Sequence, residues 1–120
     1  MCCGLYRRHN ERLVGFGSCG RQRDGALIDK GFGGEFHAIY VLRWHQGRGV
    51  GRSIMNAMSR ELSAAGHNGA SLWVLRENVP ARAFYEKLGG IIVGEKIDGG
   101  ADAALVEDAY GWCDLSSLDR

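Results

Sequence analysis

Hydrophobic residues along the chain fall into two kinds of pattern, short apolar runs and longer segments with helical spacing. The short runs are rich in β-branched and aromatic residues and are bounded by turn-forming residues, which predicts strands. The predicted strands cover residues 5–8, 12–19, 35–42, 70–75, 91–97 and 103–115. Residues 20–34 are rich in Gly, Asp and Arg, which predicts a loop with an extended piece at 26–28.

Two segments have apolar residues at the spacing of a helix. In the first segment, the predicted buried face consists of Val50, Ile54, Ala57, Met58, Leu62 and Ala65. Gly66 follows this segment as a C′ residue, so the helix is expected to have about five turns. The second helix begins at Asn78, a residue type that caps helices, has Pro80 near its first position and ends at Gly89.

The order of these elements is three strands, a helix, a strand, a helix and two strands, which predicts an α/β (α+β) fold with a mixed sheet and helices on its faces. A chain of 120 residues, 45% of them apolar, is typical of a single domain, predicted over residues 1–120. No stretch approaches the roughly 20 apolar residues of a membrane helix. No apolar segment of a signal peptide follows Arg7 and Arg8. We therefore expect a cytoplasmic protein without a membrane partner.

The charge distribution favours a small anionic ligand over nucleic acid. The net charge is +1, and residues 1–60 contain ten Lys or Arg against four Asp or Glu, whereas residues 61–120 contain five against ten. The basic residues do not gather on one predicted helix, so we expect no nucleic-acid partner. The cysteines lack the spacing of a metal site, so no metal is expected, and Cys19 and Cys113 are predicted to be small hydrophobic strand residues.

A glycine-rich run, Gln-Gly-Arg-Gly-Val-Gly-Arg at 46–52, lies between a predicted strand and the first helix. The first N–H groups of a helix have no intrahelical partner, and the macrodipole adds partial positive charge there. Glycines let a phosphate approach the backbone, and Arg48 and Arg52 add full charge. The run therefore predicts a pyrophosphate cradle. It matches neither the G-x-G-x-x-G of a dinucleotide fold nor the Gly-Lys-Ser or Gly-Lys-Thr of a P-loop.

Two motifs together carry a resemblance to a known family. The first is Gln-x-x-Gly-x-Gly, formed by Gln46, Gly49 and Gly51, and the second is Asn-x-x-Ala-x-x-Phe-Tyr-x-x-x-Gly over residues 78–89. In this order, and on these predicted elements, they resemble the GNAT superfamily of acetyl-CoA-dependent N-acetyltransferases. The resemblance implies a mostly antiparallel sheet in which the strand before the cradle diverges from its neighbour.

The resemblance also implies that acetyl-CoA is the co-substrate. Backbone amides of the glycine-rich run would hold its pyrophosphate, and the pantetheine arm would lie in the gap beside the preceding strand. The N–H of Val41 would polarise the acetyl carbonyl as an oxyanion donor. Asn78 would cap its helix or also contact the coenzyme. The coenzyme-binding residues expected from the resemblance are Ile39, Val41, Gln46, Gly47, Arg48, Gly49, Val50, Gly51, Arg52, Asn78 and Phe84.

Tyr85 is the candidate general acid by the same resemblance. A phenol of pKa about 10 stays protonated at neutral pH and can deliver its proton to a departing thiolate. Strand alternation places Glu35 and His37 on the same face as Ile39 and Val41, and either could be the general base. The alternatives are that Tyr85 only packs in a buried helix face, that Glu35 is a surface carboxylate, and that His37 is a half-exposed strand residue.

The implied function is an N-acetyltransferase that moves acetyl to a primary amine of a small molecule or peptide. We expect direct attack in a ternary complex, because no nucleophile for a covalent intermediate is evident. One alternative is a catalytically silent CoA-binding or interaction module. A nucleotide-phosphate binder unrelated to acyl transfer would rest on the glycines alone.

The chain departs from the family at two places. It lacks the usual first strand and first two helices, and Gly90 replaces the phenylalanine that commonly closes the second motif. Because the missing helices would form one wall of the acceptor site, we expect a homodimer in which a second subunit supplies that wall.

Overall fold

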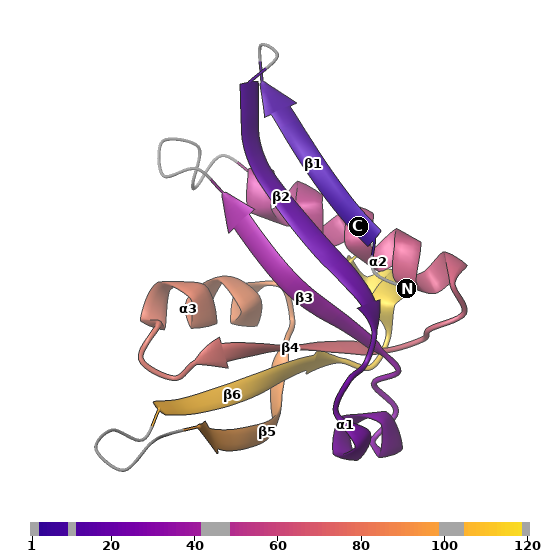
Figure 1. The fold of residues 1–120 in the computed structure, drawn as a ribbon, viewed down its shortest axis with the longest axis vertical. Coiled ribbons are helices and arrows are strands. Elements are labelled where there is room, and N and C mark those ends of the chain that lie inside the picture. The colour runs from indigo at the N-terminus through magenta and orange to yellow at the C-terminus, as the bar shows by residue number, and fades with distance from the viewer. Residues whose placement is uncertain (1–2, 10–11, 42–48, 99–104, 119–120) are drawn as a thin grey trace.

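The computed structural model describes residues 3–9, 12–41, 49–98 and 105–118 (Figure 1). The elements are β1 (Cys3–His9), β2 (Arg12–Arg21), α1 (Gly25–Asp29), β3 (Gly34–Val41), α2 (Val50–Ala64), β4 (Ala70–Leu75), α3 (Val79–Lys87), β5 (Ile91–Asp98), β6 (Leu105–Trp112) and the 3-10 turn η2 (Leu115–Leu118). Within these ranges no helix is long and apolar enough to cross a membrane. The cytoplasmic location stays a prediction.

The six strands form one sheet in the order β1-β2-β3-β4-β6-β5. All neighbours are antiparallel except β3 and β4, so the predicted mixed, mostly antiparallel sheet is confirmed. In the described chain, β3 and β4 share only the pairs Gly34–Ala70 and Glu35–Ser71. Beyond these pairs the two strands separate, and β1, β2 and β3 diverge from β4, β6 and β5 (Figure 1). This divergence confirms the expectation for the strand before the cradle.

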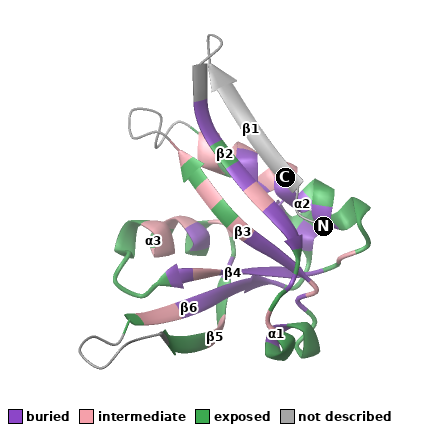
Figure 2. Ribbon diagram, viewed as in Figure 1, coloured by how far each residue is buried: buried purple, intermediate pink, exposed green. Residues whose placement is uncertain are grey.

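The main hydrophobic core lies between one face of the sheet and the helices α2 and α3. Ile54 and Met58 of α2 and Tyr85 of α3 belong to it, together with buried residues of β2, β3, β4, β6 and η2. On the other face, Leu27 of α1 packs against Ala109 of β6 in a smaller cluster. Buried positions follow β4 and β6 and the adjoining part of β3 (Figure 2). The two predicted helices, α2 and α3, thus pack on one face of the sheet, and the other face is covered by α1, which was not predicted.

The helix α1 corrects the prediction for residues 20–34, which was a loop with an extended piece at 26–28. Asp24 is the N-cap of α1, and its Oδ1 accepts hydrogen bonds from the N–H groups of Ala26 at 2.9 Å and Leu27 at 3.4 Å. Three apolar residues in a row fit a strand as well as one helical turn, so the run alone does not separate them. Capping by Asp24 and burial of Leu27 favour the turn of helix.

Two element ends also differ from the predictions. The helix α2 has 15 residues, about four turns instead of the expected five, because Gly49 is still left-handed, with φ +81°, at its N-cap. The strand β6 ends at Trp112, so Cys113 is exposed outside the sheet rather than being a strand hydrophobe. Cys19 is buried on β2, as predicted.

Candidate active site

The start of α2 holds the described part of the glycine-rich run. The N-cap Gly49 is left-handed, and no side chain of the described residues caps this helix end. The first hydrogen bond into the helix joins the N–H of Ser53 to the carbonyl of Gly49 at 3.0 Å, and Arg52 is exposed nearby. The N–H groups of the first turn therefore keep the affinity for an anion that helix N-termini have. Gln46, Gly47 and Arg48 lie outside the described residues.

Gly51 joins the two motifs in space. A Cβ atom at this position would lie 3.1 Å from Cζ of Phe84, so the Phe84 ring rests directly on the first turn of α2. Such a contact is tighter than an ordinary van der Waals approach, so a side chain at this position would require the ring to move by a few tenths of an ångström. The second motif is thus held against the glycine-rich run by a close side chain-to-backbone contact, although the two are more than thirty residues apart in the sequence.

Asn78 caps α3, as predicted from the sequence. Its Oδ1 accepts a hydrogen bond from the N–H of Ala81 at 3.3 Å, and a proline lies in the first turn. Because the helix begins at this cap, Phe84 and Tyr85 follow in its second turn and turn inward to the core. The side chain of Asn78 itself is exposed.

Tyr85 lies in an aromatic environment. Its side chain is 7% exposed, and its ring centroid lies 5.4 Å from that of Phe84, 6.2 Å from Tyr110 and 6.3 Å from Trp112. The hydroxyl has no hydrogen-bond partner among the described residues, yet it is not fully enclosed. Burial raises the pKa of Tyr85 to about 12, because the phenolate would lose hydration without gaining a partner.

Ile39 and Val41 lie on β3 beyond its last pair with β4, and both pack against the main core. Their neighbour in the ladder, β2, has Gly17 and Gly15 at the matching positions. A Cβ at Gly17 would clash with Ile54 of α2 at 2.7 Å, which shows that this side of the strands faces α2.

A β-bulge corrects the prediction that Glu35 and His37 share a face with Ile39 and Val41. Cys19 of β2 pairs with Phe36, but the preceding residue of β2 pairs with Ala38, so His37 is an extra residue in β3. The insertion reverses the alternation, and Phe36 joins the core on the α2 side. Glu35 and His37 therefore lie on the opposite face of the sheet from Ile39 and Val41.

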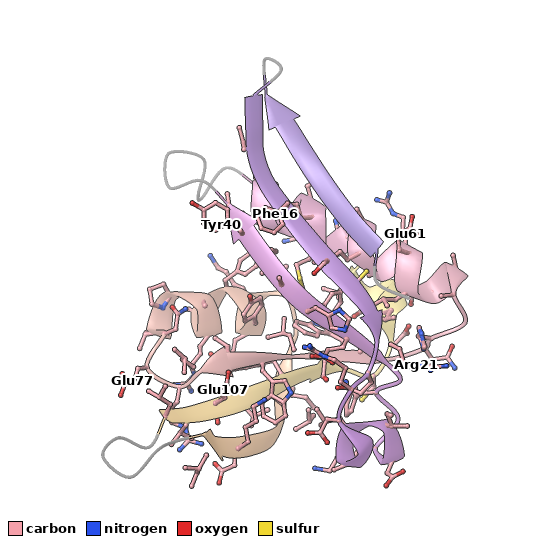
Figure 3. All side chains as sticks on the ribbon, viewed as in Figure 1. Phe16, Arg21, Tyr40, Glu61, Glu77 and Glu107 are labelled. Carbon is pink, nitrogen blue, oxygen red and sulfur yellow. The ribbon has the colours of Figure 1, made fainter. Side chains whose placement is uncertain are left out.

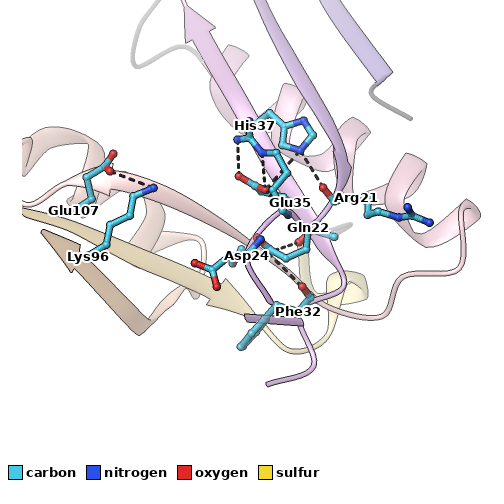
Figure 4. A network of polar contacts seen from close by, with 11 residues as sticks. Arg21, Gln22, Asp24, Phe32, Glu35, His37, Lys96 and Glu107 are labelled. Atoms are coloured by element: carbon cyan, nitrogen blue, oxygen red, sulfur yellow. Dashed lines mark hydrogen bonds and ion pairs between the residues drawn. The ribbon is translucent and has the colours of Figure 1, made fainter. Parts of the chain in front are cut away.

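Glu35 is buried, 2% exposed, and is held by Arg23 (Figure 4). Its Oε1 accepts from the backbone N–H and from Nε of Arg23, both at 3.1 Å, and its Oε2 accepts from Nη2 at 2.8 Å. Burial alone would raise the pKa of Glu35, but the hydrogen bonds and charge of Arg23 outweigh it and lower the pKa. Glu35 is thus a buried, paired carboxylate rather than the surface carboxylate that was its alternative.

His37 lies beside Glu35 (Figure 4). Its Nε2 is 3.2 Å from the carbonyl oxygen of Arg21 and 3.6 Å from Oε1 of Glu35. Both neighbours are acceptors, so the tautomer with hydrogen on Nε2 fits this position. Arg23 was not predicted as a site residue. Its signal in the sequence is only a charge opposite to that of Glu35 in a loop twelve residues earlier.

The face that carries Glu35 and His37 also exposes two aromatic rings. Phe16 and Tyr40 are partners in the ladder of β2 and β3, their ring centroids are 5.7 Å apart, and they are 37% and 53% exposed (Figure 3). Trp112, in contrast, is 2% exposed, and its indole lies against Gly90, where a Cβ would come within 2.8 Å. Trp112 is therefore a core residue.

Comparison with known proteins places the chain among acetyltransferases. The sequence model of the acetyltransferase (GNAT) family matches residues 1–90. The chain is 32% identical over 117 residues to YuaI, an uncharacterized N-acetyltransferase of Bacillus subtilis (strain 168), covering 96% of this chain and 65% of that protein. The chain thus spans less than two thirds of the length of this relative.

Solved structures share the fold at lower sequence identity. A candidate acetyltransferase of the GNAT family from Desulfovibrio desulfuricans has a TM-score of 0.76 at 16% identity, covering 95% of this chain and 69% of that one. YncA, a candidate acetyltransferase from Salmonella typhimurium solved with acetyl-CoA, has a TM-score of 0.72 at 18% identity, covering 93% and 64%. In the described residues, no group of three or more His, Cys, Asp or Glu could hold a metal ion.

Proposed function

Because the chain belongs to the acetyltransferase (GNAT) family, we propose that it moves an acetyl group from acetyl-CoA to a primary amine of a small molecule or peptide. The amine attacks the acetyl group directly in a ternary complex. The observation that carries the proposal is the contact of Phe84 with Gly51, because it brings the start of α2, the diverging edge of β3 and Tyr85 into one region.

The start of α2 is suited to the coenzyme. Bound acetyl-CoA would supply an activated acetyl thioester. The backbone N–H groups of residues 46–52 bind its pyrophosphate, with Arg48 and Arg52 adding charge. In support, a Cβ at Gly49 would meet no other atom of the described residues within 4 Å. Ile39, Val41, Asn78 and Phe84 complete the coenzyme-binding set, and the N–H of Val41 is the oxyanion donor. The Salmonella neighbour, which was solved with acetyl-CoA, has the same fold.

Tyr85 is the general acid in this proposal. With a pKa of about 12 its Oη holds the proton at neutral pH and delivers it to the departing sulfur. The ring is fixed between Tyr110 and Trp112, which leaves the hydroxyl with little freedom to leave its position. Because no protein partner competes for that proton among the described residues, a ligand atom can take it.

Glu35 and His37 are the candidates for the general base, and their contacts favour His37. Three N–H groups of Arg23 hold the carboxylate of Glu35 in its ionised form, which makes it a weak base. The Nε2–H of His37 donates to the carbonyl of Arg21 at 3.2 Å, so in the neutral ring Nδ1 has the lone pair that accepts a proton. The carbonyl of Arg21 thus orients the imidazole, and Oε1 of Glu35 lies 3.6 Å from the same nitrogen.

A catalytically silent CoA-binding module is the second candidate. It is favoured by the same pairing of Glu35 with Arg23, because a carboxylate with a lowered pKa contributes little to proton abstraction. A silent module would bind acetyl-CoA with the same residues and release no thiol beyond the uncatalysed rate.

Tyr85→Phe separates the two candidates. Thiol release from acetyl-CoA is measured with a panel of primary amines that includes polyamines, aminoglycosides, amino acids and peptides. For the enzyme, Tyr85→Phe lowers kcat by about 10²-fold, whereas the Kd for acetyl-CoA stays within twofold. Tyr40→Phe, a change of the same kind at an exposed position, is the matched control. Equal turnover in Tyr85→Phe and wild type would refute the acid role of Tyr85.

A homodimer is proposed as well. In support, the edge strand β5 exposes Ile91, Ile92 and Ile97, which are 57%, 51% and 69% exposed, and an exposed apolar edge favours association. The mass in solution at several concentrations tests this, and Ile97→Lys should shift the equilibrium towards monomer. A monomeric wild-type protein at high concentration would contradict it.

A further inference from the structure

The hydroxyl of Tyr110 joins two residues of α3. Tyr110 is fully buried on β6, donates its O–H to Oε2 of Glu86 and accepts a hydrogen bond from Nε of Arg82 at 3.1 Å. Arg82 and Glu86 are four residues apart and therefore lie on the same side of the helix, one turn from each other. A single buried hydroxyl thus contacts two successive turns of α3.

Two other residues of β6, one on each side of Tyr110 along the strand, also contact α3. Asp108 lies 3.9 Å from Nε of Arg82, and the indole Nε1 of Trp112 donates to the carbonyl of Leu88 at 3.1 Å. Asp108, Tyr110 and Trp112 alternate along the strand, so they share the face that is turned to α3. The helix is therefore attached to β6 along most of its length.

Arg76 holds both Asp108 and Arg82 in place. Asp108 is 1% exposed, and Arg76 binds its Oδ1 through Nη2 at 2.7 Å, while the carbonyl of Arg76 accepts from Nη1 of Arg82 at 3.1 Å. The hydrogen bonds of Arg76 lower the pKa of Asp108, so the carboxylate is charged at neutral pH. Arg82 is thereby confined on two sides, which restricts rotation of α3 about its own axis.

Tyr85 belongs to the same helix, and its ring centroid lies 6.2 Å from that of Tyr110 and 6.3 Å from that of Trp112. A rotation of the helix would carry the Tyr85 hydroxyl sideways, since that atom is at the end of a long side chain. Misplacement of a reacting group by about 1 Å can lower a rate by roughly 10²-fold. We propose that Tyr110 is a positioning residue for Tyr85: through Arg82 and Glu86, its hydroxyl fixes the rotation of α3 and so the place of the general acid.

This inference rests on the proposed acid role of Tyr85, and a double-mutant cycle tests the two separately. The variants are Tyr85→Phe, Tyr110→Phe and the double variant, with Tyr40→Phe as control. Tyr110→Phe keeps the ring in the core and removes only the hydroxyl. We expect it to lower kcat by about tenfold with an unchanged KM for acetyl-CoA, and to cause no further loss in the Tyr85→Phe background.

A purely structural role of Tyr110 would give another result. Loss of stability alone would lower the amount of active protein by the same factor with or without the Tyr85 hydroxyl, so equal losses in both backgrounds overturn the proposal. An unchanged kcat in Tyr110→Phe overturns it while leaving the acid role of Tyr85 intact. An unchanged kcat in Tyr85→Phe overturns both, and is recognised from that single variant.

A second pair of variants covers the case in which Tyr110→Phe does not fold. Glu86 is exposed, so its replacement opens no cavity in the core. Glu86→Gln retains an oxygen that accepts the Tyr110 hydrogen bond, whereas Glu86→Ala does not. We expect Glu86→Ala to lower kcat severalfold and Glu86→Gln to restore it towards wild type. Equal kcat in Glu86→Ala and wild type overturns the proposal.

Discussion

Tyr85 and Glu35 are two buried titratable groups on opposite faces of the same sheet, and their pKa values move in opposite directions. Tyr85 is surrounded by rings, and burial raises its pKa to about 12. Glu35 is more deeply buried, but Arg23 surrounds both carboxylate oxygens and lowers its pKa. The comparison shows that the partner, and not burial, decides which groups keep a proton at neutral pH.

The strongest test of the comparison concerns Tyr85 at high pH. The folded-state pKa of about 12 exceeds the ordinary 10.0, so neutral Tyr85 stabilises the native state below pH 10, and this stabilisation is lost as the pH rises through 12. We expect a loss of about 2–3 kcal/mol from this group alone. Unfolding by urea between pH 9 and pH 12 should therefore be less pH-dependent in Tyr85→Phe than in wild type. Identical slopes would show that Tyr85 titrates normally.

Removing the Arg23 side chain should leave Glu35 buried without its arginine partner, as Tyr85 is buried without a hydrogen-bond partner among the described residues. In Arg23→Ala the carboxylate stays buried and loses two side-chain hydrogen bonds, so we expect a loss of about 1–2 kcal/mol in unfolding free energy at pH 7, modest because the Arg23 side chain is largely solvent-exposed. The backbone N–H of Arg23 still reaches Glu35 in the variant. Arg21→Ala, at an exposed neighbouring position, is the control. Equal stability of Arg23→Ala and Arg21→Ala would mean that the ion pair contributes little.

The loss of unfolding free energy at acidic pH should depend on Glu35. Its pKa is lower in the folded chain than its ordinary value of 4.5, so ionised Glu35 stabilises the native state above that pH, and the effect disappears as the pH falls through the folded pKa. Urea unfolding at pH 7 and pH 3 should show a smaller difference in Glu35→Gln than in wild type. An unchanged difference in unfolding free energy between pH 7 and pH 3 would mean that other carboxyl groups cause the loss of stability in acid.

The smallest effect on stability is expected at Gly51. A methyl group there meets Phe84 at 3.1 Å, and the ring must move by a few tenths of an ångström, while alanine favours the helix. These two effects oppose each other, so Gly51→Ala should change the unfolding free energy by about 0.5 kcal/mol or less. Its Kd for acetyl-CoA should nevertheless rise, as measured by calorimetric titration. Gly25→Ala, at an exposed position outside the proposed site with open space for a methyl group, is the control; equal Kd values would argue against a cradle at Gly51.

The sequence predicted the elements that depend on local signals. The strand at 70–75 has the bounds that its apolar run predicts, and Asn78 caps α3 as its position before Pro80 suggests. The order of the strands and of α2 and α3 matches the prediction, to which the structure adds α1 and η2, and the type of sheet is confirmed. Each of these features depends on a few neighbouring residues, which is why periodicity and capping rules predict them.

The arrangement of the site depended on features that are not local. His37 is an extra residue in β3, and only the pairing of β3 with β2 reveals it. A prediction from simple alternation of faces therefore places the residues before the bulge on the wrong face. The pairing of Arg23 with Glu35 joins a residue just before α1 to a residue of β3, and the apolar triplet did not predict the turn of helix between them. The contact of Phe84 with Gly51 joins two motifs whose distance in space the sequence does not contain.

Thermal unfolding with and without acetyl-CoA tests most directly the central claim, a coenzyme site at the start of α2 beside Phe84 and Tyr85. Acetyl-CoA at a hundredfold excess over its Kd should stabilise the native chain by about 2.7 kcal/mol and raise Tm by several degrees. Coenzyme A should give a comparable shift, whereas Gly51→Ala should reduce both. An unchanged Tm with acetyl-CoA, in a wild-type chain that unfolds cooperatively, would contradict the account.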